Sequence, residues 1–304
     1  MVTTNALVRS PDTLRFLQAD FSIEDPVILQ LGGSDPLQMK AAAKVAFDYG
    51  YKEININCGC PSEKVADAGC FGAALMLNPA LVSELALSVS EITGVPATIK
   101  CRIGVDDNDS YEELVHFIKQ VSEVGHVQHF IIHARKALLG KKFTPADNRK
   151  IPPLKYDIVY SLIKDFPHLM FTINGGILTM DEVEHQLKQG VHGVMVGRAV
   201  IDAPYNWRNI DSKLYQSPDP GLSRRQIIES YAEYIGKEEK VQGPRARSAL
   251  MKPILNLFHK EFNGKLFRRL INDRMIDKIN PMPLDDMLLE CVSVVPDTIM
   301  DSVS

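Results

Sequence analysis

The sequence predicts an α/β protein, a (β/α)8 TIM-type barrel that lacks its first strand and is followed by a small C-terminal helical bundle. Short β-rich apolar runs alternate with segments whose apolar residues recur every three or four positions, as in a parallel sheet whose strands are joined by helices. Polar residues recur at the carboxyl ends of the expected strands, which is where a barrel collects its functional groups. A doubly wound open sheet is the alternative, although no G-x-G-x-x-G follows the first expected strand.

The expected strands number at most seven, fewer than a closed (β/α)8 barrel needs. A strand remnant at residues 1–4 comes first. The complete strands are expected at residues 27–31, 53–57, 97–101, 129–133, 170–174 and 193–197, and the helices between them at residues 36–49, 79–92, 110–124, 156–164 and 180–188.

Residues 217–221 read Ser-Pro-Asp-Pro-Gly, which interrupts regular structure and predicts an interdomain linker. We therefore expect a barrel domain at residues 1–216 and a helical domain at residues 217–304. In the second domain, helices are expected at residues 223–237, 246–259 and 265–275, followed by a tail. Residues 219–278 hold thirteen Lys or Arg against eight Asp or Glu, whereas residues 279–304 hold five acids and no base.

Composition limits the partners and the compartment. The formal net charge is −4, so a nucleic acid must bind to a local basic patch. No apolar run is long enough for a membrane span, and the odd number of five cysteines indicates reduced thiols. We expect a cytoplasmic monomer, with an organellar location as the alternative if a longer form carries a targeting peptide.

Cys60 is the candidate catalytic residue, because it lies between Gly59 and Pro61 in a loop that follows an expected strand. Thiols are mostly protonated at neutral pH, so a cysteine can donate a proton to carbon as well as act as a nucleophile. The alternative is that Cys58, Cys60 and Cys70 are buried packing residues. A metal site is less favoured, because Cys-x-Cys without a nearby His lacks the spacing of a zinc site.

Two strand ends that contain glycine predict a phosphate site. Gly175-Gly176 follows one expected strand and Gly197-Arg198 follows the next, and barrels hold phosphates there with backbone N–H groups and a cation. A lone Gly-Gly pair is more often only a turn. The other polar residues at strand ends are Gln30, Lys100, Arg102, His133, Arg135, Lys136 and Asn174.

Seven motifs in a fixed order carry a resemblance to a known family. They are Asn-x-Asn-Cys-Gly-Cys-Pro-Ser, Phe-Gly-Ala-Ala-Leu-Met, Ile-Lys-Cys-Arg-Ile-Gly-Val-Asp-Asp, Ile-Ile-His-Ala-Arg-Lys-Ala, Asn-Arg-Lys-Ile-Pro-Pro-Leu-Lys-Tyr-Asp, Ile-Asn-Gly-Gly-Ile and Gly-Val-Met-Val-Gly-Arg-Ala. Over nearly its whole length the chain resembles the tRNA-dihydrouridine synthases, and in particular their A-type branch, which acts on positions 20 and 20a.

The resemblance implies an FMN-dependent reduction of uridine to 5,6-dihydrouridine in the D-loop of tRNA, with NADPH as the reductant. The reduced flavin would give a hydride to C6 of the uracil, and Cys60 matches the acid that protonates C5. By motif position, the FMN site comprises Gln30, Lys100, His133, Asn174, Gly175, Gly176, Gly197 and Arg198, and the tRNA contacts comprise Asn57, Arg102, Arg135 and Lys136. Further cations for tRNA are Lys141, Lys142, Arg149 and Lys150 and, in the helical domain, Arg245, Arg247, Lys252, Lys265, Arg268 and Arg269, each with a solvated surface position as the alternative.

The start of the chain departs from the family pattern. Members begin with a strand that carries an Ala-Pro-Met type motif, whereas this sequence begins with Met-Val-Thr-Thr, which matches their second strand. We therefore expect an N-terminally truncated barrel that retains FMN weakly and is less stable. Two alternative functions remain, a catalytically impaired tRNA-binding isoform and an FMN barrel reductase of a free small molecule.

Overall fold

The computed structural model describes residues 1–10, 13–24, 26–61, 71–140, 143–144, 146–276 and 281–303. The chain forms two compact units. The first comprises Met1–Gly176 and His185–Met195, and the second comprises Ile177–Glu184 and Val196–Ser304. The last division between the two units falls at residues 195 and 196, whereas the domain boundary was expected between residues 216 and 217. Residues 217–222 form no helix or strand, and the expected boundary stays a prediction.

Seven parallel strands form the sheet of the first unit, in the order in which they occur along the chain. They are β1 (Val2–Thr3), β2 (Ile28–Gly32), β3 (Glu53–Cys58), β4 (Thr98–Arg102), β5 (His129–His133), β6 (Met170–Asn174) and β7 (Gly193–Met195). A doubly wound sheet reverses its strand order part-way, whereas this order never reverses, so the predicted barrel-type α/β fold is confirmed. Within the described ranges no ladder joins β7 to β1, so these two strands are the edges of the sheet.

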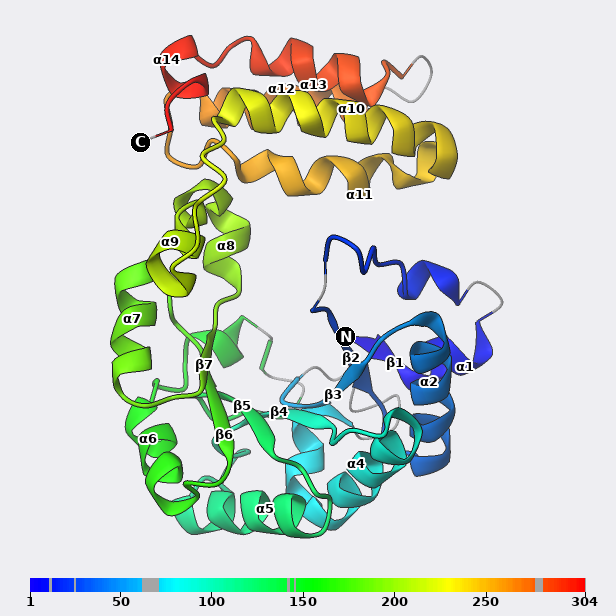
Figure 1. Cartoon of the computed structure of the whole chain (residues 1–304), viewed down its shortest axis with the longest axis vertical. Coiled ribbons are helices and arrows are strands. Elements are labelled where there is room, and N and C mark those ends of the chain that lie inside the picture. The colour runs from blue at the N-terminus through cyan, green and yellow to red at the C-terminus, as the bar shows by residue number, and fades with distance from the viewer. Residues whose placement is uncertain are drawn as a thin grey trace. The chain divides into compact units, whose positions relative to one another are not determined.

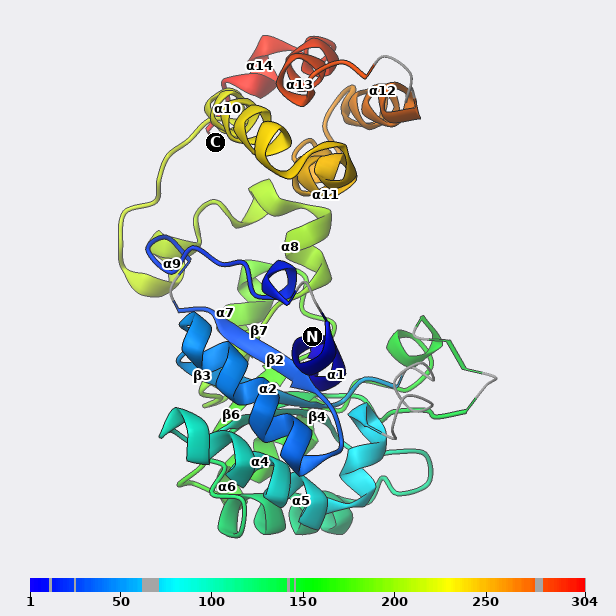
Figure 2. The ribbon, with the colours of Figure 1, turned by 90° about the vertical axis from the view of Figure 1, so that its right-hand side faces the viewer.

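The helices of the first unit alternate with its strands, as predicted. They are α1 (Thr4–Arg9), α2 (Pro36–Tyr49), α4 (Pro79–Thr93), α5 (Tyr111–Glu123), α6 (Tyr156–Asp165) and α7 (Met180–Lys188), the last of which passes from one unit to the other. Helices α2, α4 and α5 each begin at a side-chain cap, since Asp35, Asn78 and Ser110 accept a hydrogen bond from a backbone N–H of the first turn. In Figure 1 the helices α2, α4, α5 and α6 lie outside the curved row of strands, and Figure 2 shows α2, α4 and α5 side by side.

The two faces of the sheet differ in chemistry, because successive side chains of a strand point to opposite faces. One face carries a row of buried apolar side chains that the strand register aligns, namely Leu31, Ile56, Ile99, Phe130 and Phe171. The residues that alternate with this row are mostly polar. The apolar face therefore supplies the core beneath the helices, and the other face is free to carry a polar site.

The second unit is helical, and its C-terminal part forms a bundle around one apolar core. Its helices are α8 (Arg198–Asp202), α9 (Ile210–Tyr215), α10 (Arg224–Gln242), α11 (Arg247–Met251), α12 (Gly264–Ile276), α13 (Leu284–Val292) and α14 (Asp297–Met300). Ile235, Phe267 and Met287 are fully buried in the core. None of the described helices is both long and apolar enough to span a membrane.

Three expectations for this bundle are wrong in detail. The segment expected to be a tail forms α13 and α14, because its apolar residues complete the core. The helix α10 continues past residue 237 to Gln242, so Gly236 lies inside it. The glycine leaves room for α13, because an added Cβ at Gly236 would stand 2.6 Å from Asp285 Oδ2. The helix expected at residues 246–259 breaks into α11 and a 3-10 segment, Lys252–Asn256, at Pro253, which has no N–H to continue it.

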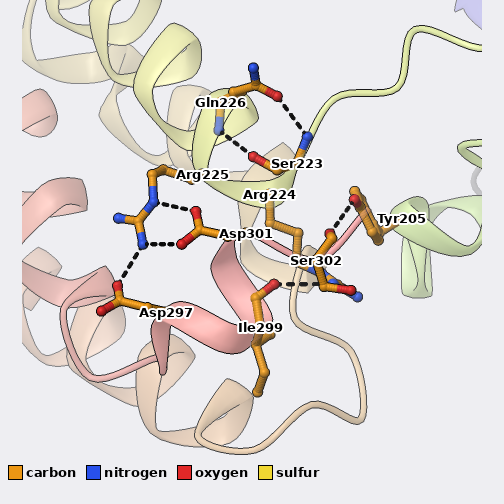
Figure 3. A network of polar contacts seen from close by, with 9 residues as sticks. All are labelled: Tyr205, Ser223, Arg224, Arg225, Gln226, Asp297, Ile299, Asp301 and Ser302. Atoms are coloured by element: carbon orange, nitrogen blue, oxygen red, sulfur yellow. Dashed lines mark hydrogen bonds and ion pairs between the residues drawn. The ribbon is translucent and has the colours of Figure 1, made fainter. Parts of the chain in front are cut away.

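The start of α10 is fastened to the chain end by Arg224 (Figure 3). The guanidinium of Arg224 lies 3.9 Å from the ring centroid of Tyr205 and donates to Glu261 at 2.6 Å. The Tyr205 hydroxyl lies within hydrogen-bonding distance of the carbonyls of Leu222, at 3.0 Å, and Ser302, at 2.9 Å. Because the Arg224 side chain is only 8% exposed, these contacts bury its charge with a partner.

Arg225 pairs with the acidic end of the chain (Figure 3). It donates to Asp297 and Asp301, each at 2.5 Å, and both aspartates are well exposed. These hydrogen bonds lower the pKa of Asp301 and raise that of Arg225. The charge separation seen in the sequence is thus partly cancelled, and Arg225 is occupied within the unit.

We predict that Arg224→Ala lowers the free energy of unfolding by about 3 kcal/mol, because it leaves the half-buried Glu261 without its buried partner and removes the stacking on Tyr205. Arg225→Ala is the matched control at the next position, where solvent screens the exposed ion pairs and the loss of stability should be much smaller. Urea unfolding of both variants measures the difference. Equal losses would contradict the assignment of Arg224 as the residue that holds the bundle to the chain end.

Candidate active site at the carboxyl ends of the strands

A chain of side-chain amides crosses three strands on the polar face of the sheet. Gln30 Nε2 donates to Asn55 Oδ1, Asn55 Nδ2 donates to Thr98 Oγ1, and Asn57 Nδ2 donates to Gln30 Oε1, each at 2.8 Å. Asn55 and Asn57 are buried. A buried amide that lacked partners would cost about 1–3 kcal/mol, so this mutual pairing is what allows polar groups in the interior.

Asn57 also holds the turn that carries Cys60. Its Oδ1 accepts hydrogen bonds from the backbone N–H groups of Gly59, at 3.1 Å, and Cys60, at 2.9 Å. The Gly59 carbonyl accepts from Arg102 Nε at 2.9 Å. Both sides of the turn are therefore fixed by side chains from β3 and β4 before any ligand binds.

The cysteines of the first unit differ in exposure. Cys58 and Cys101 are fully buried, and burial raises the pKa of Cys58 well above its ordinary value and that of Cys101 to about 12. Cys60 is only half-buried. The packing alternative therefore suits Cys58, whereas Cys60 is the thiol in reach of a ligand; Cys70 lies outside the described residues. In the described part of the chain, no His, Cys, Asp and Glu side chains gather into a group that could hold a metal ion.

Arg102 lies beneath this turn with 6% of its surface exposed. Besides Gly59, it donates through Nη1 to the carbonyls of Lys136, at 2.9 Å, and Asn148, at 3.2 Å. Burial lowers the pKa of Arg102 to about 10, and the neighbouring Cys60 opposes this effect. The guanidinium keeps its charge at neutral pH and joins the turn after β3 to two positions in the segment between β5 and α6. Its expected contact with tRNA stays a prediction.

Lys100 and Asn174 form a second polar pair across the same face. Lys100 Nζ donates to Asn174 Oδ1 at 2.9 Å, and Asn174 Nδ2 donates to the carbonyl of Met195 at 2.7 Å. Burial lowers the pKa of Lys100 to about 8, and the positive charge of Arg102 adds to this effect. The register places His133 beside both Arg102 and Asn174, so the expected flavin-binding residues of β4, β5 and β6 lie together.

The turn after β6 requires glycine. Gly175 and Gly176 have φ of +115° and +73°, and an added Cβ would stand 3.1 Å from His133 Nε2 at the first position and 2.4 Å from Leu154 Cδ1 at the second. The Tyr156 hydroxyl donates to the Gly175 carbonyl at 2.5 Å. This part of the expected phosphate site is thus a side-chain-free turn.

Gly197 and Arg198, the other half of the expected phosphate site, belong to the second unit. Gly197 precedes the short helix α8, and both residues are exposed. An added Cβ at Gly197 would meet no atom within 4 Å, so packing in this unit does not require glycine there. Their role in binding a phosphate stays a prediction.

The expected tRNA contacts of the loop after β5 are partly engaged within the protein. Arg135 donates to the Pro152 carbonyl, and Lys136 pairs with Asp109 at 2.9 Å and donates to the Asp106 carbonyl at 2.8 Å. Arg149 and Lys150 are exposed, whereas Lys141 and Lys142 lie outside the described residues.

Sequence reasoning did not single out four residues that build this site, namely Asn55, Thr98, Asn148 and Tyr156. Asn148 is fully buried and its side chain pairs with the backbone of Leu138. Asn148 Oδ1 accepts from the Leu138 N–H at 2.7 Å, and Asn148 Nδ2 donates to the Leu138 carbonyl at 2.8 Å. Asn55, Asn148 and Tyr156 lie within two of the seven family motifs, so their motif positions could have identified them as site residues. Thr98 gave none, because only the strand register brings it to Asn55.

Comparison with known proteins relates the chain to enzymes of tRNA modification. The family model described as "Dihydrouridine synthase (Dus)" matches residues 1–288. The tRNA-dihydrouridine(20/20a) synthase of Vibrio vulnificus is 41% identical over 274 residues, which cover 90% of this chain and 81% of that protein. Proteins of the same name from Synechocystis sp. and Pasteurella multocida are 41% and 42% identical, over 90% of this chain and 79% and 81% of theirs.

Among solved structures, an old yellow enzyme homologue from Zymomonas mobilis matches 60% of this chain and 52% of its own, with a TM-score of 0.40 and 14% identity. A similarity this low supports no argument about the chain.

We predict that Asn57→Ala loosens the turn at Cys60, because two backbone N–H groups lose their acceptor. At about 1 kcal/mol for each bond, hydrogen exchange at residues 59 and 60 should speed up by about tenfold or more. Asn55→Ala is the matched control, a buried amide of the same strand with no bond to the turn. Equal exchange at residues 59 and 60 in the two variants would contradict the anchoring role of Asn57.

We predict that Lys100 makes the protein more stable as pH rises from about 8 to 10.5. In this window the unfolded chain binds a proton that folded Lys100 has already released, so the free energy of unfolding increases, by at most about 3 kcal/mol. Below pH 8 both states hold the proton and this dependence vanishes. Urea unfolding between pH 8 and 10.5 should show the rise of unfolding free energy with pH in the wild type and in the exposed control Lys119→Met, and a smaller rise in Lys100→Met. An unchanged rise in Lys100→Met would refute the prediction.

Proposed function

Because the chain belongs to the dihydrouridine synthase family, we propose that it reduces a uridine of tRNA to 5,6-dihydrouridine, with FMN as the bound cofactor and NADPH as the reductant. The names of the relatives support positions 20 and 20a, in the D-loop, as the targets. The observation that carries the proposal is the polar face of the sheet, where Lys100 and the amide chain lie next to the turn of Cys60.

The residues of the first unit fit a flavin. An isoalloxazine ring offers carbonyl and ring-nitrogen acceptors, and Gln30 and Lys100 are donors on the polar face of the sheet. A phosphate needs backbone N–H groups that side chains do not cover, and the turn at Gly175 and Gly176 has no side chains. We assign Gln30, Lys100 and His133 to the ring, and Asn174, Gly175 and Gly176 to the phosphate end; a phosphate contact of Gly197 and Arg198 stays a prediction from the family resemblance.

The chemistry divides between cofactor and protein. When bound, the reduced flavin supplies the hydride that adds to C6 of the uracil. The thiol of Cys60 donates its proton to C5, so that hydride and proton together saturate the double bond. Arg102, whose Nε donates to the Gly59 carbonyl, and Asn57, which accepts from the Cys60 N–H, hold the turn that presents this thiol.

Exposed cations support tRNA as the partner. Arg149 and Lys150 are exposed in the first unit, and Arg245, Lys252, Lys265 and Arg269 in the second. Arg247 is occupied, because it pairs with Glu239 and donates to the Met282 carbonyl at 2.7 Å. The cations that remain at the surface are suited to phosphates along an RNA backbone.

One observation favours the alternative of a catalytically impaired tRNA-binding protein. The described part of the sheet has two unpaired edges, β1 and β7, and an open edge leaves less protein to enclose a flavin. The absorption spectrum of the purified protein with added FMN decides between the two: a flavin spectrum at stoichiometric occupancy supports the synthase, and a colourless protein that still binds tRNA supports the alternative. Reduction of free uridine would instead support a small-molecule reductase.

We predict that Cys60→Ala lowers dihydrouridine formation at least about a hundredfold, since a positioned general acid contributes about that much or more. FMN content and tRNA affinity should stay unchanged, because the thiol is not assigned to either. Mass spectrometry of nucleosides from unmodified tRNA treated with enzyme and NADPH gives the rate. Cys58→Ala, two residues away and fully buried, is the control and should keep its rate; full activity of Cys60→Ala would remove Cys60 from the mechanism.

A further inference from the structure

A hollow of about 560 Å³ lies on the second unit, lined by the turn at residues 258–263 and by the first turns of α12. Its lining includes the cations Lys260, Lys265 and Arg268, together with His259 and the aromatic ring of Phe262. None of these residues belongs to the cofactor site proposed above.

Phe262 is an exposed aromatic residue on a fixed turn. It is 69% exposed, although burying a phenylalanine side chain would be favourable by about 2–3 kcal/mol. The turn cannot fold inward, because Phe258 and Phe267 are buried on either side of it and their rings meet edge to face at 5.0 Å. Asn263 Nδ2 donates to the Val294 carbonyl at 2.6 Å and holds the turn to the bundle. The ring of Phe262 is thus held toward the solvent.

The charges around Phe262 are positive. Lys260 and Lys265 are exposed, and neither forms an ion pair with any residue that the structure describes. The acid of the lining, Glu261, is neutralised by Arg224. Arg268 donates to the neutral Asn256, at 3.1 Å, and keeps its charge. The hollow therefore attracts anions around a central aromatic surface.

We propose that Phe262 is a base-stacking subsite for an unpaired nucleotide of the tRNA, with Lys260 and Lys265 binding the phosphates that flank it. The proposal rests on the proposed function and adds to it a contact that recognises unpaired RNA. An exposed ring among cations fits this partner, because every base has a face that stacks on an aromatic side chain while the backbone on both sides is anionic. An acidic polypeptide would use the lysines but not the ring.

The first test compares Phe262→Ala with Tyr215→Ala, an equally exposed aromatic residue of the same unit, also 69% exposed. Fluorescence anisotropy gives the Kd of each full-length variant for unmodified tRNA and for a fully paired RNA duplex. Phe262→Ala should weaken tRNA binding about tenfold and leave duplex binding unchanged, and Phe262→Trp should restore the affinity. Tyr215→Ala should change neither. Equal losses for tRNA and duplex, or no loss at all, would overturn the proposal.

The second test separates stacking from charge. Lys260→Ala and Lys265→Ala should weaken tRNA and duplex alike and reduce the slope of log Kd against log salt by about 1 each, whereas Phe262→Ala should leave this slope unchanged. Polyglutamate and single-stranded RNA of equal charge are then compared as competitors of tRNA. If polyglutamate displaces tRNA as effectively as the RNA does, an acidic protein is the favoured partner and the RNA assignment is overturned.

The proposed function and this subsite can fail separately. A wild-type protein that forms dihydrouridine while Phe262→Ala binds tRNA normally would overturn the subsite alone. A wild-type protein that forms no dihydrouridine, but loses tRNA affinity on Phe262→Ala and not on Tyr215→Ala, would support the subsite and overturn the proposed function.

Discussion

The pleat of the parallel strands sets the chemistry of the first unit, because it sends alternate side chains to opposite faces of the sheet. One face places Leu31, Ile56 and Ile99 in a single aligned row, and the helices cover it. The other face carries amides and a lysine in an interior where unpaired polar groups are costly. The pairing of Gln30 with Asn57, and of Lys100 with Asn174, is the physical condition for having a polar site there at all.

The same pairing prepares the site for its ligands. Asn57 and Arg102 hold the turn of Cys60 through its backbone, so the thiol is set in place by buried groups of two strands and not by the substrate. Burial then moves the pKa of Lys100 toward neutrality, whereas Arg102 keeps its charge. A site fixed in advance loses less free energy in reorganisation when the reaction occurs.

The second unit uses its charges in two ways. Arg224 and Arg225 hold the start of α10 within the unit: Glu261, in the turn before α12, pairs with Arg224, and Asp297 and Asp301, near the end of the chain, pair with Arg225. The cations left at the surface, such as Lys265 and Arg269, are the ones free to meet an anionic partner. The excess of Lys and Arg in residues 219–278 therefore overstates the basic surface of this unit, because the acidic C-terminal segment pairs with Arg225.

The sequence alone determined the order of strands and helices, the strand that carries Lys100 and the turn after a strand that carries Cys60, because apolar periodicity and polar position are local properties. It also carried the family resemblance. Only the tertiary structure decided that α13 and α14 complete the core, that Gly236 lies within a helix, and that Asn57 and Arg102 hold the Cys60 turn. These depend on contacts between distant residues, such as Arg102 with Asn148, which no local pattern encodes.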